Sequence, residues 1–172
     1  MSETLIRPEE PSDIDAIRAI NVAAFAGQPY SQQTEHLIVD ALRDNGALSV
    51  SLVAVREEQT VGHAAFSEAV VGEMADGWYL AGPVAVLPEF QHLGIGSTLM
   101  LSGLERLRAR HAKGCVLVGD PGFYRRLGFE MYPGLAYEGV PDEFVLGLSF
   151  GDEAPTGEIK AHRAFEIRPP SE

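Results

Sequence analysis

A short apolar segment at 84–86 is followed by a turn that contains two glycines and then by a segment with helical periodicity. This order predicts a strand, a loop and a helix. Gly94 and Gly96 allow positive φ and let the backbone approach a ligand closely. In such a loop, successive N–H groups converge on an anion at the N-terminus of the following helix. The segment therefore predicts a phosphate-binding loop.

Two other phosphate-binding loops also place glycines between a strand and a helix, and neither fits. The loop of nucleotide hydrolases ends in Gly-Lys-Ser/Thr, whereas Gly96 is followed by Ser97 and Thr98. A dinucleotide-binding Gly-x-Gly-x-x-Gly needs a third glycine at position 99, which is Leu99.

The remaining pattern, Gln91-x-x-Gly94-x-Gly96, resembles the acyl-coenzyme A loop of the GCN5-related N-acetyltransferase (GNAT) superfamily. A second segment, Tyr124-x-x-x-Gly128-Phe129, resembles that family's late Tyr-x-x-x-Gly-Phe motif, in the form seen in a subgroup of small predicted bacterial acetyltransferases. Both motifs occur in the family's order and at its separation. The alternative for the glycines is that they only shape a tight start to the helix.

The resemblance implies an α/β fold with a mixed, mostly antiparallel central sheet of six to seven strands and helices on both faces. It implies transfer of an acetyl group from acetyl-CoA to a primary amine of a small molecule or peptide, directly within a ternary complex. The Val86 N–H would face the thioester oxygen, and Tyr124 would be the general acid for the departing thiolate. The implied cofactor-binding residues are Val84, Ala85, Val86, Gln91, His92, Leu93, Gly94, Ile95, Gly96, Ser97, Thr98 and Tyr124.

Periodicity and turn residues predict the other elements. A strand at 5–6 precedes a helix capped by Ser12 and a second helix that starts near Ser31. Further strands are expected at 47–55, 61–71, 78–86, 115–118, 129–132 and 143–150, with helices after the glycine loop and at 121–127. We assign 1–150 to the acetyltransferase domain and 151–172 to a C-terminal appendage, in which 158–167 would add an edge strand as an alternative.

Composition limits the partners of the protein. A chain of 172 residues with a formal charge of −12 suits one domain and repels a nucleic-acid backbone. The acidity favours a cationic or neutral acceptor over an acidic one, or only maintains solubility. No apolar run suggests export or membrane insertion, so we expect a cytoplasmic monomer or homodimer that binds neither membranes nor nucleic acid.

Several roles stay open at this level. Glu68, His63, Asp120 or a water chain would take the proton of the acceptor amine, and His92 is either a phosphate contact or an exposed loop residue. Packing between Phe123 and Phe129 is the alternative role for Tyr124. Cys115 lacks a nearby base, and no metal-binding spacing occurs. Phe25 and Tyr30 are candidates to line the acceptor pocket, and the alternative function is a non-catalytic acyl-CoA-binding sensor or regulatory module.

Overall fold

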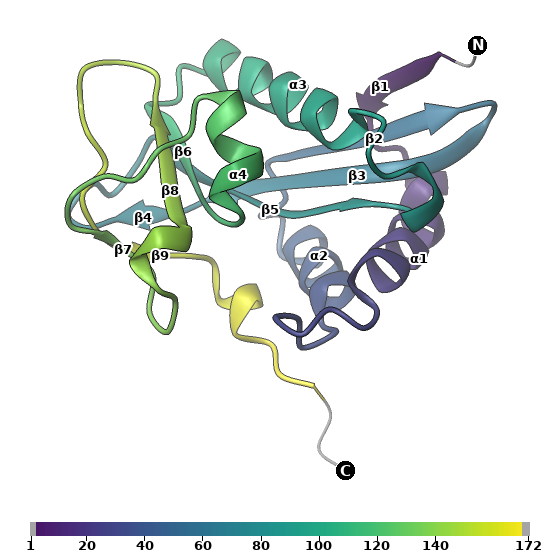
Figure 1. The fold of residues 1–172 in the computed structure, drawn as a ribbon, viewed down its shortest axis with the longest axis horizontal. Coiled ribbons are helices and arrows are strands. Elements are labelled where there is room, and N and C mark those ends of the chain that lie inside the picture. The colour runs from purple at the N-terminus through teal and green to yellow at the C-terminus, as the bar shows by residue number, and fades with distance from the viewer. Residues whose placement is uncertain (1–2, 170–172) are drawn as a thin grey trace.

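The computed structural model describes residues 3–169 and contains a six-stranded sheet with the order β1-β2-β3-β5-β6-β8 (Figure 1). Neighbouring strands are antiparallel except β5 and β6, which are parallel. The predicted mixed, mostly antiparallel sheet is thereby confirmed. Its strands are β1 (Thr4–Pro8), β2 (Val50–Arg56), β3 (Gln59–Glu68), β5 (Trp78–Val86), β6 (Gly114–Val118) and β8 (Val145–Ser149).

Helices cover both faces of this sheet. The helices α1 (Ile14–Phe25) and α2 (Glu35–Asp44) pack on one face, and α3 (Ile95–Ala109) packs on the other (Figure 1). Successive side chains of β2 point to opposite faces of the sheet, so this strand contributes to the core on each face. Leu52 joins the core beneath α3, whereas the adjacent Val53 packs with Ile17 of α1 and Val39 of α2.

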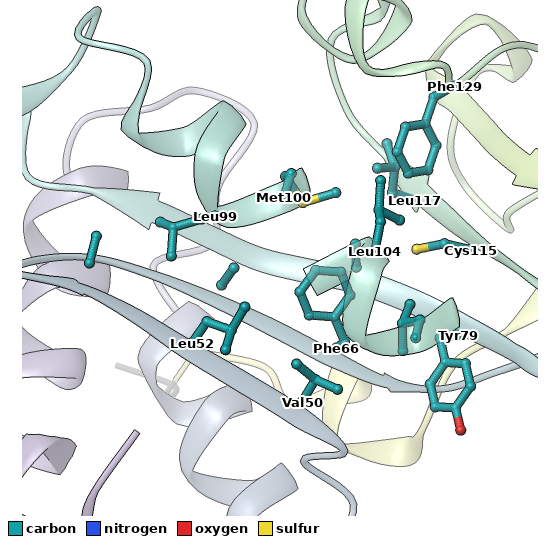
Figure 2. Packing of buried hydrophobic residues seen from close by; sticks show 14 of the residues in the cluster. Val50, Leu52, Phe66, Tyr79, Leu99, Met100, Leu104, Cys115, Leu117 and Phe129 are labelled. Atoms are coloured by element: carbon teal, nitrogen blue, oxygen red, sulfur yellow. The ribbon is translucent and has the colours of Figure 1, made fainter. Parts of the chain in front are cut away.

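The larger core lies between α3 and the sheet. Leu99, Met100 and Leu104 of α3 are buried against residues of β2 and β3, and Figure 2 shows their side chains above Leu52 and Phe66. Full burial of each such side chain contributes about 1.5–3 kcal/mol. A Cβ at Gly103 would overlap the Phe66 ring, so a glycine at this position lets the helix lie close to β3.

A second sheet, which the sequence patterns did not predict, has the order β4-β9-β7. Its strands are β4 (Val70–Val71), β9 (Gly157–Lys160) and β7 (Leu135–Ala136). Leu135 and Ile159 of this sheet share a small core with Trp78 of β5. The strand expected at 129–132 is wrong, because that segment forms only a single bridge between Glu130 and Gly147. The central strand of the second sheet comes from the segment beyond residue 150.

The first two helices start later than expected. Ser12 lies in a 3-10 turn, and Asp13 instead accepts the Glu10 N–H at 2.7 Å and forms an ion pair with Arg7 at 2.7 Å. The second helix begins at Glu35 rather than near Ser31, because Gln33 has a φ of 63° and interrupts the helical conformation.

The helix expected at 121–127 is present as α4 (Pro121–Tyr124) followed by a 3-10 turn, Arg125–Leu127. The remaining 3-10 turns are Pro11–Asp13, Pro88–Phe90, Asp142–Phe144 and Arg163–Glu166.

Candidate active site

The strands β5 and β6 separate halfway along their length. They pair only from Trp78 to Leu80 of β5, opposite Gly114 to Val116 of β6, although β5 continues to Val86. Pro83 lies just beyond the paired part and has no N–H to donate. The register between β3 and β5 also shifts here. The result is a split in the sheet whose sides are the distal halves of β5 and β6.

The backbone of Val86 faces this split. Residues of an antiparallel strand alternate between facing the paired strand and facing away from it. Leu87 N–H donates to Val61 O of β3 at 2.9 Å, so the adjacent Val86 turns its N–H and C=O away from β3. The Gln91 side chain donates to Val86 O at 3.0 Å, which ties the following loop to the strand. By the same alternation, Val84 faces the split, whereas Ala85 faces β3.

The glycine loop joins the end of β5 to α3. Gly94 has a φ of 83° and sits at the N-cap of α3, as the sequence predicted for this residue. The prediction of a positive φ for Gly96 is wrong: this residue lies in the first turn of α3 with helical geometry. His92 also has a positive φ, of 66°, so both His92 and Gly94 of this loop adopt the left-handed conformation.

In this loop the backbone, rather than the side chains, offers the surface to which a ligand can bind. Ile95 is buried in the core, and the Thr98 hydroxyl donates to Gly94 O at 2.9 Å. His92 and Leu93 are exposed, and Ser97 is half-buried. The first N–H groups of a helix have no partner within it, so those of Ile95, Gly96 and Ser97 can bind an anion.

Phe123, which the sequence indicated only as a packing partner of Tyr124, lies beside the glycine loop. A Cβ placed on Gly96 would be 3.6 Å from the Phe123 ring and 3.9 Å from the Val86 side chain. The loop, the end of β5 and α4 therefore meet at one point beside the split. No local sequence signal would have revealed this contact, because it depends on how α4 packs in three dimensions.

Tyr124 is mostly buried at the mouth of the split. Its ring stands edge-on to Phe123 at 4.7 Å and to Phe129 at 5.9 Å between centroids, and lies against Gly119. Burial raises the pKa of Tyr124 to about 12, with smaller contributions from Cys115, Tyr30 and Asp120. The phenol is therefore protonated at neutral pH and can act as a proton donor. The packing role and the donor role are both compatible with this position.

Tyr30 comes to the same region from the opposite layer. It lies on the loop between α1 and α2, with 76% of its surface exposed, and its phenol is near enough to contribute to the pKa of Tyr124. Phe25, the other candidate for the acceptor pocket, is the last residue of α1 and is half-buried.

The three candidate bases have other surroundings. His63 is fully buried on the face covered by α1 and α2, where its Nε2 lies 2.8 Å from Ser51 Oγ, and burial lowers its pKa to about 4. The Asp120 carboxylate accepts the Gly122 N–H at 3.0 Å and caps α4. Glu68 is exposed at the far end of β3, opposite Tyr79 rather than Val86. His63 and Glu68 therefore lie away from the mouth of the split, whereas Asp120 lies near Tyr124 with its carboxylate engaged as the cap of α4.

Cys115 is buried in β6, and burial raises the pKa of its thiol, which disfavours the nucleophilic thiolate. Within residues 3–169, no three His, Cys, Asp or Glu side chains are grouped to hold a metal ion. None of the helices in this range has the length and apolar character needed to cross a bilayer.

A sheet split between two parallel strands, beside a glycine loop and a tyrosine-bearing helix, defines an acetyltransferase fold. The acetyltransferase (GNAT) domain family matches residues 47–131. The *Escherichia coli* K12 protein YhbS, named an uncharacterized N-acetyltransferase, is 34% identical over 128 residues, 74% of each chain. The chain belongs to the GNAT family.

Solved structures agree with this assignment. A GNAT family acetyltransferase from *Brucella melitensis*, determined in complex with acetyl-CoA, is 45% identical to this chain with a TM-score of 0.84. The match covers 95% of this chain and 98% of the *Brucella* protein. YhbS from *Escherichia coli*, determined in complex with CoA, has a TM-score of 0.88 at 28% identity and covers 97% of this chain and 94% of its own.

Proposed function

We propose that this protein transfers the acetyl group of acetyl-CoA to a primary amine of a small molecule or peptide, directly within a ternary complex. Family membership supports the acetyl-CoA-dependent acyltransferase activity, and the *Brucella* relative was solved with this donor. The observation that carries the proposal is the split between β5 and β6, which turns the backbone of Val86 toward the space beside the glycine loop.

The proposed donor site follows the split toward α3. The pantetheine arm pairs with the outward-facing backbone of Val84 and Val86, in place of a neighbouring strand. The pyrophosphate accepts hydrogen bonds from the backbone of the loop over 91–98, where Gly94 sets the turn and the helix dipole favours negative charge. Ile95 contributes through its backbone, because its side chain is buried, whereas the backbone of Ala85 faces β3 and makes no contact in the proposed donor site.

The proposed reaction uses two groups of this chain. The acceptor nitrogen attacks the thioester carbon, and the Val86 N–H stabilises the negative charge on the carbonyl oxygen. The carbon–sulfur bond then breaks, and the departing thiolate takes the phenol proton of Tyr124, whose raised pKa keeps it protonated beforehand and makes it regain a proton from water afterwards. The amine loses its proton to water, because Glu68 and His63 do not face the site and the Asp120 carboxylate is engaged as the cap of α4.

The acceptor enters on the side of the loop between α1 and α2. Tyr30 supports this direction, because it is exposed and close to Tyr124. The charge of −12 favours a cationic or neutral amine over an acidic one.

Isothermal titration calorimetry with acetyl-CoA tests the donor site. The wild type is compared with two variants, Gly94→Asp and Gly94→Asn. Both side chains tolerate positive φ and have nearly equal size, and the space around Gly94 is open. The two variants therefore differ mainly in charge. We expect stoichiometric binding by the wild type, a loss of more than tenfold in Gly94→Asp and a smaller loss in Gly94→Asn. Absence of wild-type binding would refute the proposal.

A second assay separates the enzyme from a sensor. Wild-type protein with acetyl-CoA is offered a panel of amines, peptides and polyamines, and release of free CoA is followed. Turnover above background with one acceptor supports the transferase. Binding without turnover across the panel would favour a non-catalytic acyl-CoA-binding module.

A further inference from the structure

Two arginines lie over aromatic rings beside the glycine loop of this acidic protein. The guanidinium carbon of Arg126 is 6.0 Å from the centre of the Phe123 ring, and that of Arg56 is 5.9 Å from the centre of the Phe90 ring. Contacts of this kind hold a cation in place at a modest gain in free energy. Both rings border the loop: Phe123 contacts the Gly96 position, and Phe90 directly precedes Gln91.

The surroundings of Arg126 leave its charge available. The residue is exposed, in the 3-10 turn that follows α4. The cations that form ion pairs in the described part of the chain are Arg7, Arg18, Arg43 and Lys113, and Arg126 is not among them. Arg56 is also absent from these ion pairs, so position rather than pairing distinguishes the two arginines.

The two arginines differ in their position relative to the split. Arg56 ends β2 at the hairpin to β3, on the side of β5 away from the split. Arg126 follows α4, which itself follows β6, the strand on the other side of the split (Figure 1). A donor that runs along the split and past the N-terminus of α3 therefore comes near Arg126 and not Arg56.

Coenzyme A carries a third phosphate that the glycine loop does not account for. Beyond the pyrophosphate, its ribose bears a 3′-phosphate, a monoester with a charge of about −2 at neutral pH. A guanidinium matches a phosphate with two parallel hydrogen bonds. We propose that Arg126, held by Phe123, pairs with the 3′-phosphate and makes the site prefer coenzyme A to its 3′-dephospho form.

This inference rests on the placement of the pyrophosphate proposed above. Titration calorimetry with acetyl-CoA and with 3′-dephospho-acetyl-CoA tests it in the wild type and in Arg126→Gln. The matched control is Arg56→Gln, which removes the same charge from the same kind of ring contact. A hydrogen-bonded charge pair at a partly exposed site predicts a loss of about tenfold in affinity for acetyl-CoA in Arg126→Gln.

The affinity of Arg126→Gln for the dephospho form should stay within about twofold of the wild type, and Arg56→Gln should keep the wild-type ratio between the two ligands. Equal losses for both ligands in Arg126→Gln, or equal changes in the two variants, would overturn the inference. An affinity of Arg126→Gln for acetyl-CoA equal to that of the wild type would also overturn the inference. Failure of the donor site itself is distinguishable, because Gly94→Asp would then bind acetyl-CoA as the wild type does.

Discussion

At the scale of single residues, Tyr124 combines packing with a chemical group that fits proton donation. Its ring is fixed between Phe123 and Phe129, and its raised pKa keeps the phenol protonated over the whole range in which the protein would work. Tyr124→Phe keeps the ring and removes the proton. We expect kcat to fall roughly 100-fold with an unchanged Kd for acetyl-CoA. Steady-state kinetics beside calorimetry measure both, and a wild-type kcat at saturating substrates would remove Tyr124 from the mechanism.

His63 makes the stability of the protein depend on pH. Burial lowers its pKa from 6.5 to about 4, so the folded state prefers the neutral ring. The stability that this neutral form contributes is fully present above pH 6.5 and is lost as the pH falls toward 4. Between pH 7 and pH 5 the loss is about 2 kcal/mol, at about 1.4 kcal/mol per unit of pKa difference.

Urea unfolding at the two pH values measures this effect, with His63→Gln as the control variant. The variant should be less stable than the wild type at pH 7, because it disturbs a buried position beside Ser51. Its stability should change less between pH 7 and pH 5. Equal pH dependence in the two proteins would show that another group titrates.

Gly94 and Gly96 illustrate how far the sequence predicts the site. The motif placed the loop between β5 and α3 and identified Gly94 as the residue with positive φ, because that conformation follows from local chain geometry. The same reasoning failed for Gly96, which is helical. The contact of Phe123 with this position depends on tertiary packing, which no local pattern carries.

At the scale of elements, a substitution in the first turn of α3 should have opposite effects on the stability of the protein and on its affinity for acetyl-CoA. A methyl group at Gly96 meets Phe123 and Val86 at ordinary contact distances. Gly96→Ala should therefore leave the free energy of unfolding unchanged or raise it by up to about 1 kcal/mol. The same methyl group projects into the junction of loop, strand and α4, so acetyl-CoA affinity should fall. Thermal unfolding and calorimetry check the two effects, and unchanged affinity would place the donor elsewhere.

Long elements were easier to predict than short ones. The elements β2, β3 and α3 have at least seven residues each, and the structure contains a strand or helix at each of these predicted places. In contrast, β4 and β7 have two residues each, too few to show a period, and their pairing with β9 joins distant parts of the chain. The alternation at 129–132 was misleading because its partner segment offers only one bridge.

At the scale of the whole molecule, the segment beyond residue 150 contributes to the fold. The strand β9 lies between β4 and β7, and Ala164 packs with Ile38 and Leu42 of α2. Truncation after Phe150 should therefore lower the thermal midpoint by more than 5 °C or yield insoluble protein. Truncation after Arg168 is the control and should leave the midpoint within about 2 °C of the wild type. A stable protein that ends at Phe150 would support a separable C-terminal appendage.

The central place of β9 also determines how the chain can assemble during synthesis. The ribosome makes β4 and β7 well before the strand that joins them, so neither finds its partner when it emerges. Their unpaired backbone edges stay open until β9 arrives, and open edges are where nascent chains associate wrongly. For this protein, the emergence of β9 from the ribosome is thus the step that closes the second sheet and ends that exposure.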